Sequence, residues 1–412
     1  MISTRWDDEE RLWIADAKKS SAEDTVAEIV AGLLDRPPLW PDVAGLDVSE
    51  HQRDTLTLSL AGRVGVLGGS PGTGKTYSLA RLIKAVIDTC GAEAVAVCAP
   101  TGKAAVRISE TMLGYDVPVV ARTIHGLLGV AQVEETEGWG FAHGEDKPLP
   151  FDFVFVDESS MIDTGLMASL LSALQPGTHV LFVGDVNQLP PVGHGAPLRD
   201  LIDAGVPHGS LTEIRRNSGR IVQACAEIRD TGKFTPSPRL APDAGENLFV
   251  LAANSAESTA DRIITSLMGI KENGIADPVW ECQVIVAVNK GNPVARRELN
   301  HRLQEALNPS GASCGSNPFR TNDKIVCLKN GWLPECDADG NTSMDFNLET
   351  GQEETVTLFI ANGEIGRVVK VQDKYTIAQF DNDRCVLIPR GTSKGDDESD
   401  DENASNTGCQ FD

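Results

Sequence analysis

A lysine and a threonine end a glycine-rich segment whose spacing suits the phosphates of a nucleotide. The segment GGSPGTGKT, residues 68–76, follows the apolar stretch VGVL and precedes YSLARLIKAV, which has helical periodicity. Its core, from Gly69, matches the phosphate-binding loop: a glycine, four residues, then Gly-Lys-Thr. In such a loop backbone N–H groups face the phosphates, the lysine neutralises their oxygens and the threonine hydroxyl ligates Mg²⁺. We therefore predict a site for ATP and Mg²⁺, with Lys75 on the phosphates and Thr76 on the metal ion.

Two carboxylates follow a second apolar stretch. In FDFVFVDESS, Asp157 and Glu158 come at its C-terminal end, where ligands bind in open α/β sheets. We expect Asp157 to hold the Mg²⁺ through water, and Glu158 to act as the general base that aligns and deprotonates the attacking water. An isolated Asp-Glu pair is a weak signal, and the phosphate-binding loop upstream is what makes it informative.

A third apolar stretch ends in VGDVNQLPPVGHGAPLRDL. The amide of Gln188 can accept from a water and donate to a phosphate, so it is a candidate sensor of hydrolysis. The Leu-Pro-Pro segment that follows is stiff, which suits a lever between the nucleotide and another surface. The alternative interpretation is an ordinary proline-rich loop.

Composition restricts the class of protein. The formal net charge of −24 argues against coating nucleic acid through bulk positive charge, so any such contact depends on a few placed residues. Nine cysteines without a CxxC pair indicate neither a disulfide framework nor a zinc site. No apolar run is long enough for a membrane span, and the acidic start does not resemble a signal peptide. We expect a cytoplasmic protein with no membrane partner.

The pattern of apolar residues predicts an α/β fold with several parts. Buried strands alternate with helical stretches in the first half, which is typical of a parallel sheet covered on both faces. A second α/β pattern opens with LFVLAA and CQVIVAV, and short strands with Gly and Asn turns then predict an inserted β-barrel. The expected parts are a helical N-terminal segment (1–45), a first α/β domain (46–232), and a second domain (233–412) with a barrel at about 322–390 and an acidic tail at 394–412.

Six motifs together resemble the RecD-like branch of superfamily 1 DNA helicases. They are GGSPGTGKT, APTGKAAVRISE, ARTIHGLLG, VDESSMID, GDVNQLPPVGHGAPLRDLI and LTEIRRNSGRIV, in that order. The resemblance implies two RecA-like motor domains that hydrolyse ATP and move 5′→3′ along single-stranded DNA. An alternative from another class is a nucleotide-dependent DNA-binding or regulatory protein without unwinding activity.

The resemblance also assigns roles to single residues. It implies that Gln52 reads adenine, and that Arg216 reaches the γ-phosphate, with Arg215 as the neighbour that is easily mistaken for it. The implied DNA-backbone contacts are Thr101, Gly102, Lys103, Thr123 and His125. The predicted nucleotide-binding set is Gln52, Gly69, Ser70, Pro71, Gly72, Thr73, Gly74, Lys75, Thr76 and Tyr77.

Two further segments have open interpretations. Residues 131–150 stand where relatives carry a strand-separating hairpin, and Trp139 or Phe141 either stacks on a base or simply packs. In the barrel, four cations either contact DNA or lie on a solvated face: Lys324, Lys329, Arg367 and Lys370.

The end of the chain departs from the family pattern. No segment of the VHKxQG type follows CVLIP. The tail KGDDESDDENASNTGCQFD is either a solvated loop before a further strand or a natural acidic terminus.

Overall fold

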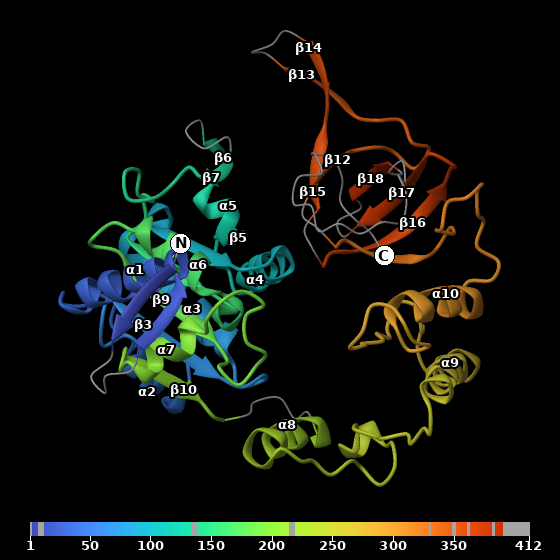
Figure 1. Cartoon of the computed structure of the whole chain (residues 1–412), viewed down its shortest axis with the longest axis horizontal. Helices are drawn as coiled ribbons and strands as arrows, with labels where there is room; N and C mark the ends of the chain where they lie inside the picture. The colour runs from blue at the N-terminus through green and yellow to red at the C-terminus, as the bar shows by residue number, and fades with distance from the viewer. Residues whose placement is uncertain are drawn as a thin grey trace. The chain divides into compact units, whose positions relative to one another are not determined.

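The computed structural model describes residues 2–6, 12–133, 138–213, 219–328, 331–347, 352–360, 363–380 and 384–389 (Figure 1). The chain forms two compact units, Met1–Phe249 and Val250–Asp412. The acidic tail, Lys329 and Arg216 lie outside the described residues.

The first unit begins with a strand pair and a helix. Strands β1 (Ile2–Trp6) and β2 (Leu12–Asp16) pair antiparallel, and α1 (Ala17–Leu34) follows, with the Asp16 carboxylate accepting from Lys18 N at 3.0 Å as its N-cap. The prediction of a purely helical segment over 1–45 was therefore wrong in its first part. These strands are short and charged, so their pairing leaves no clear alternating pattern in the sequence.

A six-stranded parallel sheet forms the centre of the first unit, which confirms the predicted fold class. The strand order is β10-β3-β9-β8-β4-β5. The strands are β3 (Val64–Gly69), β4 (Val95–Ala99), β5 (Arg122–Thr123), β8 (Phe153–Val156), β9 (His179–Gly184) and β10 (His208–Leu211). Because all are parallel, their carboxyl ends meet at one edge.

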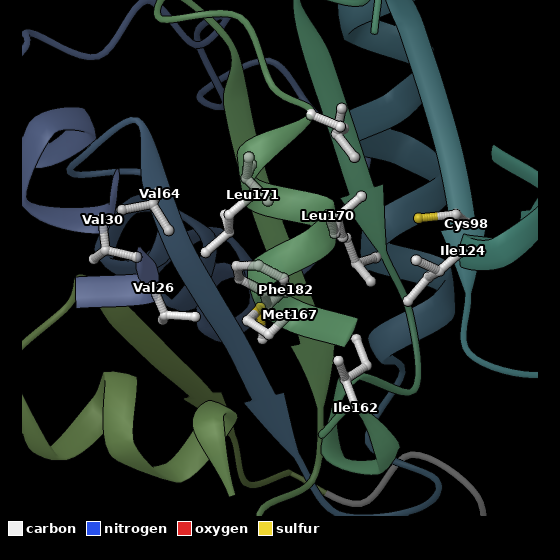
Figure 2. Close-up of a cluster of buried hydrophobic side chains, with 14 of the residues drawn as sticks. Val26, Val30, Val64, Cys98, Ile124, Ile162, Met167, Leu170, Leu171 and Phe182 are labelled. Atoms are coloured by element: carbon white, nitrogen blue, oxygen red, sulfur yellow. The ribbon is translucent and has the colours of Figure 1, made fainter. Parts of the chain in front are cut away.

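Helices cover both faces of this sheet, and alternate residues of each strand enter opposite cores. Val64 and Val66 of β3 join one core with α1 and α6, whereas Leu67 joins the other core, which includes α3. Figure 2 shows the first of these cores, where Phe182 and Met167 lie between the sheet and α6. Burial on both faces explains the continuous apolar runs in the sequence. The helices of the first unit after α1 are α2 (Glu50–Ser59), α3 (Lys75–Cys90), α4 (Gly102–Gly114), α5 (Ile124–Leu128), α6 (Thr164–Ser172), α7 (Pro197–Asp203) and α8 (Gly219–Thr231), of which α8 lies apart from the sheet (Figure 1), and 3₁₀ turns occur at Ala92–Ala94, Ser159–Met161 and Pro242–Ala244.

A hairpin follows α5. Strands β6 (Val130–Val133) and β7 (Gly138–Phe141) pair antiparallel, with Val130 opposite Phe141. The hairpin falls where the sequence predicts one. The Phe141 ring packs against the core of the first unit, which favours the packing interpretation for this residue, while the Trp139 side chain lies outside the described set.

The second unit combines two helices with antiparallel strands. Four strands pair in the order β11-β16-β17-β18 around a core that includes Ile325, Val368 and Val386. A bridge between Glu335 and Val386 joins β18 to the residue after β12. The elements are α9 (Ala256–Glu272), α10 (Arg296–Leu307), β11 (Lys324–Val326), β12 (Gly331–Pro334), β13 (Met344–Asn347), β14 (Gln352–Thr355), β15 (Thr357–Ile360), β16 (Ile365–Val371), β17 (Tyr375–Phe380) and β18 (Arg384–Pro389).

Two strands expected at the start of the second domain do not form. The segments LFVLAA and CQVIVAV are described but belong to no strand, and Ile285 is 89% exposed. An interior parallel strand needs hydrogen-bonding neighbours on both sides. Among the described residues of this unit, no strand runs beside either segment, so high β-propensity alone was not sufficient. Within the described ranges, no helix is both long and apolar enough to span a membrane.

Candidate functional site

The phosphate-binding loop connects β3 to α3 and depends on glycine conformation. Gly74 has φ 91° and stands at the N-cap of α3, where no side chain caps the helix. The backbone N–H groups in the first turn of α3 are therefore available to bind an anion. A side chain at Gly74 would come within 2.7 Å of Gln52 Nε2, so both the backbone angle and the space favour glycine.

Lys75 is folded over the loop that precedes it. Its ammonium group donates to Gly69 O at 2.5 Å and Ser70 O at 3.3 Å. The buried Thr73 hydroxyl also donates to Ser70 O, at 2.7 Å, which holds the loop closed on itself. The lysine charge thus lies within the curl of the loop, where nucleotide phosphates bind in proteins of this type.

Asp157 and Glu158 follow β8 at the same edge of the sheet. Burial raises the pKa of Asp157 to about 6, while the Glu158 N–H, Lys75 and Arg107 act in the opposite direction. The Glu158 N–H donates to Asp157 Oδ1 at 2.8 Å. Glu158 itself has φ 51°, an uncommon conformation for a residue with a side chain and one that often occurs at functional sites. The structure therefore brings the carboxylates and Lys75 to one edge.

Asp185 and Gln188 follow β9, which lies between β3 and β8. The buried Asp185 carboxylate accepts from Asn187 N at 3.0 Å, and Gln188 N donates to Asp185 O at 3.0 Å, so Asp185 orders the turn through both its side chain and its backbone. Gln188 is exposed and Leu189 is 86% exposed. An amide and an apolar side chain therefore face solvent after β9, the strand between those that lead to the phosphate-binding loop and to the carboxylates.

Gln52 is buried, and its amide lies between the start of α2 and the phosphate-binding loop. Its Oε1 accepts from Ser49 N at 3.1 Å in the capping box of α2, and its Nε2 lies over Gly74. The geometry therefore gives Gln52 a structural role at the loop, in addition to the adenine contact that the family resemblance implies.

Tyr77 lies in an aromatic and cationic cluster that sequence reasoning missed. Its ring is 5.4 Å from the Tyr115 ring, and the Arg81 guanidinium carbon lies 5.0 Å and 5.5 Å from the two ring centroids. The Tyr77 hydroxyl donates to Asp47 O at 2.8 Å. Spacing on α3 places Arg81 one turn after Tyr77, but Tyr115 comes from the end of α4, and nothing in the sequence marks it.

The candidate DNA contacts lie on two adjacent helix N-termini. Strands β4 and β5 are neighbours. The hydroxyl of Thr101, which comes shortly after β4, caps α4 by accepting from Ala104 N, and the hydroxyl of Thr123, the last residue of β5, caps α5 by accepting from Gly126 N. Gly102 is buried in the first turn of α4, whereas Lys103 and His125 are exposed. Cationic and N–H donors at such turns suit phosphate oxygens.

The predicted phosphate arginine, Arg216, is outside the described residues, but another arginine is at the loop. Arg229 of α8 donates from Nη1 to Ser70 Oγ at 3.4 Å, and from Nε to Asp230 at 2.7 Å. Asp230 is the main cause of the raised pKa of Arg229, and Asp185 contributes as well. No motif includes Arg229, so only the fold identifies it.

A parallel sheet with a glycine-rich loop, a lysine and carboxylates at one edge defines a nucleotide-binding protein of the P-loop class. The comparisons with known proteins agree. The model of an AAA domain family matches residues 52–194. The ATP-dependent RecD2 DNA helicase of Deinococcus radiodurans is 33% identical over 379 residues, covering 89% of this chain and 46% of that protein. The RecBCD enzyme subunit RecD of Mycobacterium tuberculosis is 34% identical over 247 residues, 54% of this chain and 42% of that protein.

The chain is thus homologous to the RecD-like helicases along most of its length, which confirms the resemblance seen in the motifs. It spans about half the length of the curated relatives it matches. Among solved structures, the Pif1 helicase from Candida albicans covers 83% of this chain and 78% of its own, at 18% identity and a TM-score of 0.38.

Proposed function

We propose that this chain hydrolyses ATP and couples the hydrolysis to 5′→3′ movement along single-stranded DNA, as a RecD-like helicase. The observation that carries the proposal is the meeting of Lys75, Asp157 and the Asp185 turn at the ends of three neighbouring strands. The homology to RecD2 and RecD supports the choice of DNA as the track.

The residues at this edge fit Mg²⁺ with ATP. The Thr76 hydroxyl and Asp157 carboxylate would hold the ion, which would neutralise charge on the phosphates. Within the described part of the chain, no group of three His, Cys, Asp or Glu is placed to bind a metal. That suits Mg²⁺, which takes one or two protein ligands together with phosphates and water.

Each remaining side chain has a separate task. Glu158 accepts the proton of the attacking water, and Gln188 orients that water while contacting the γ-phosphate. Lys75 exchanges its present carbonyl partners, Gly69 O and Ser70 O, for phosphate oxygens. The exposed loop after Gln188 transmits the change between nucleotide states to another surface, since its two prolines limit how the loop can bend.

The DNA grip is proposed at the N-termini of α4 and α5. Thr101, Gly102 and Thr123 present backbone N–H groups, and Lys103 and His125 add side-chain donors to successive phosphates. His125 lies 5.7 Å from Phe141, ring to ring, so the hairpin of β6 and β7 adjoins this grip.

The test is ATP turnover with and without single-stranded DNA. We expect DNA to stimulate turnover, Lys75→Ala to lower it by more than about 100-fold, and Glu158→Gln to bind ATP without turning it over. Lys84→Ala, an exposed lysine of α3 paired with Asp88, is the matched control and should behave as the wild type.

A rate of ATP hydrolysis that single-stranded DNA does not change would contradict the helicase proposal and favour a nucleotide-dependent regulatory protein. Displacement of a 5′-tailed duplex, and not of a 3′-tailed one, tests the direction. Normal turnover in Lys75→Ala would overturn the site itself.

A further inference from the structure

The first turn of α2 makes contacts on both sides of the phosphate-binding loop. Gln52 lies over Gly74, near the end of the loop. The residue before it, His51, reaches the chain just after β10. There, Thr212 N donates to His51 Nε2 at 3.1 Å, and the Thr212 hydroxyl oxygen lies 3.4 Å from the same nitrogen. This contact joins two residues that are 161 positions apart in the sequence.

Strand β10 ends beside the first residue of the phosphate-binding core. Leu211, the last residue of β10, pairs with Gly69. A β-carbon on Gly69 would come within 2.9 Å of Leu211 O, so the two backbones are in close contact. The carbonyl oxygen of Gly69 in turn accepts from the Lys75 ammonium at 2.5 Å. Movement of the end of β10 would therefore displace the start of the loop and the lysine that the loop holds.

Polar residues at helical spacing attach α2 to β10. They are His51, Thr55 and Ser59, each four positions after the last, and such residues lie on one face of a helix. Gly209 N of β10 donates to the Ser59 hydroxyl at 3.0 Å. A β-carbon on Gly209 would overlap the carbonyl oxygen of Thr55, so helix and strand pack with their backbones in contact. Hydrogen bonds therefore join α2 to β10 near the start of the strand, through Ser59, and just after its end, through His51.

The contact between His51 and Thr212 requires a neutral imidazole. A ring nitrogen that accepts from a backbone N–H carries no hydrogen of its own, so the proton of the His51 ring is on Nδ1. The ring gives an acceptor to the first backbone N–H beyond the paired residues of β10. Nothing in the sequence connects His51 with Thr212, so only the fold identifies this contact.

We propose that His51 is a positioning residue for ATP hydrolysis. Its ring holds the end of β10 against the start of the phosphate-binding loop, while Gln52 lies over the end of the loop. Helix α2 thereby supports the loop at both ends and keeps its N–H groups and Lys75 at the spacing that the phosphates need. This role rests on the proposed function, since it assumes that the loop binds ATP for hydrolysis.

The test measures ATP turnover by the full chain at saturating single-stranded DNA. We expect His51→Ala to lower kcat about 5- to 10-fold and to change the KM for ATP less than about 2-fold. The loop N–H groups and Lys75 still bind the phosphates in this variant, but a small displacement of the reacting groups slows the chemical step. His51→Gln should keep at least about half of the wild-type kcat, because the glutamine oxygen can accept from Thr212 N.

Two control variants separate positioning from a general loss of packing. His208→Ala removes an exposed histidine at the opposite end of β10 and should behave as the wild type. Ser59→Ala removes the other hydrogen bond between α2 and β10, which is buried and lies away from the loop. We expect Ser59→Ala to lower the thermal unfolding midpoint at least as much as His51→Ala, yet to leave kcat within about 2-fold of the wild type. An equal loss of kcat in Ser59→Ala and His51→Ala would show that any loosening of α2 slows turnover, and the role of His51 at the loop would be wrong.

Amide hydrogen exchange measures the contact directly. The peptide that contains Thr212 should exchange faster in His51→Ala than in the wild type, because its N–H loses the imidazole acceptor. In His51→Gln the same peptide should exchange at the wild-type rate. Exchange that is unchanged in His51→Ala would show that the ring does not hold this N–H, and would overturn the proposed role.

The outcomes separate the role of His51 from the proposed function. A wild-type kcat in His51→Ala, with DNA-stimulated turnover by the unaltered chain, would overturn only the role of His51. No ATP turnover by the unaltered chain would overturn both.

Discussion

Arg229 shows how a single residue can reach a site that lies far from it in sequence. It contacts Ser70, 159 positions earlier, and shares its guanidinium with its neighbour Asp230. A side chain in this position would add positive charge beside the phosphates of a bound nucleotide.

At the residue scale, we expect Arg229→Ala to raise the KM for ATP about 3- to 10-fold, because a charge-assisted contact to phosphate is lost. Arg229→Lys should recover part of the effect. The control is Arg239→Ala, which removes an exposed arginine paired with Glu246. Steady-state ATP kinetics measure all three, and an unchanged KM in Arg229→Ala would show that the contact with Ser70 has no role in binding.

At the scale of elements, the segment between α1 and α2 attaches the N-terminal helix to the base of the sheet. Leu39 N donates to His179 Nε2 at 2.9 Å, and the indole of Trp40 donates to Gly62 O at 2.8 Å. The His179 ring stacks on Phe153, with centroids 4.9 Å apart. An imidazole that accepts a backbone N–H while buried among aromatic rings must be neutral.

Burial, together with the nearby Arg63, lowers the pKa of His179 to about 4, with Asp152 acting weakly in the opposite direction. The unfolded chain takes up this proton at higher pH than the folded chain. The stability that the neutral ring contributes is therefore complete above the unfolded value of 6.5 and is lost as the pH falls toward 4.

We expect the free energy of unfolding to fall by about 2 kcal/mol more in the wild type than in His179→Gln between about pH 7.5 and about pH 5. Glutamine can still accept from Leu39 N but does not titrate. Urea unfolding at the two pH values measures the difference. His208→Gln, whose ring is exposed, should follow the wild type, and equal pH dependence in His179→Gln and the wild type would show that His179 can be protonated in the folded state.

At the scale of the whole molecule, a net charge of −24 repels the DNA phosphates. Binding of DNA must therefore come from a few local positive groups. Each phosphate contact with a single strand contributes about −0.7 to the slope of log affinity against log salt. The proposed contacts at the N-termini of α4 and α5 are few.

We therefore expect a slope between about −2 and −4, and a slope shallower by about 0.7 in Lys103→Ala. Lys84→Ala, remote from the proposed grip, should keep the wild-type slope. Titrations of oligo(dT) over a range of salt concentrations measure the slope of log affinity against log salt. A flat response would contradict phosphate contact, and a slope near −8 would contradict the small number of contacts.

By itself, the sequence determined the features that depend on neighbouring residues or on burial along one strand. The phosphate-binding loop is contiguous from Gly69 to Thr76, and the buried strands of the parallel sheet are continuous apolar runs, so both could be predicted. The hairpin of β6 and β7 was placed by family resemblance. The loop and the buried strands are local properties, and residue spacing records them directly.

Only the tertiary structure decided which distant side chains meet and which β-prone segments find partners. Arg229 at Ser70, Tyr115 beside Tyr77, and Arg367 on Trp280 each join elements far apart in sequence, and no spacing rule connects them. CQVIVAV has strand propensity yet forms no strand among the described residues, because a strand is stabilised by hydrogen bonds to neighbours that its own sequence does not contain.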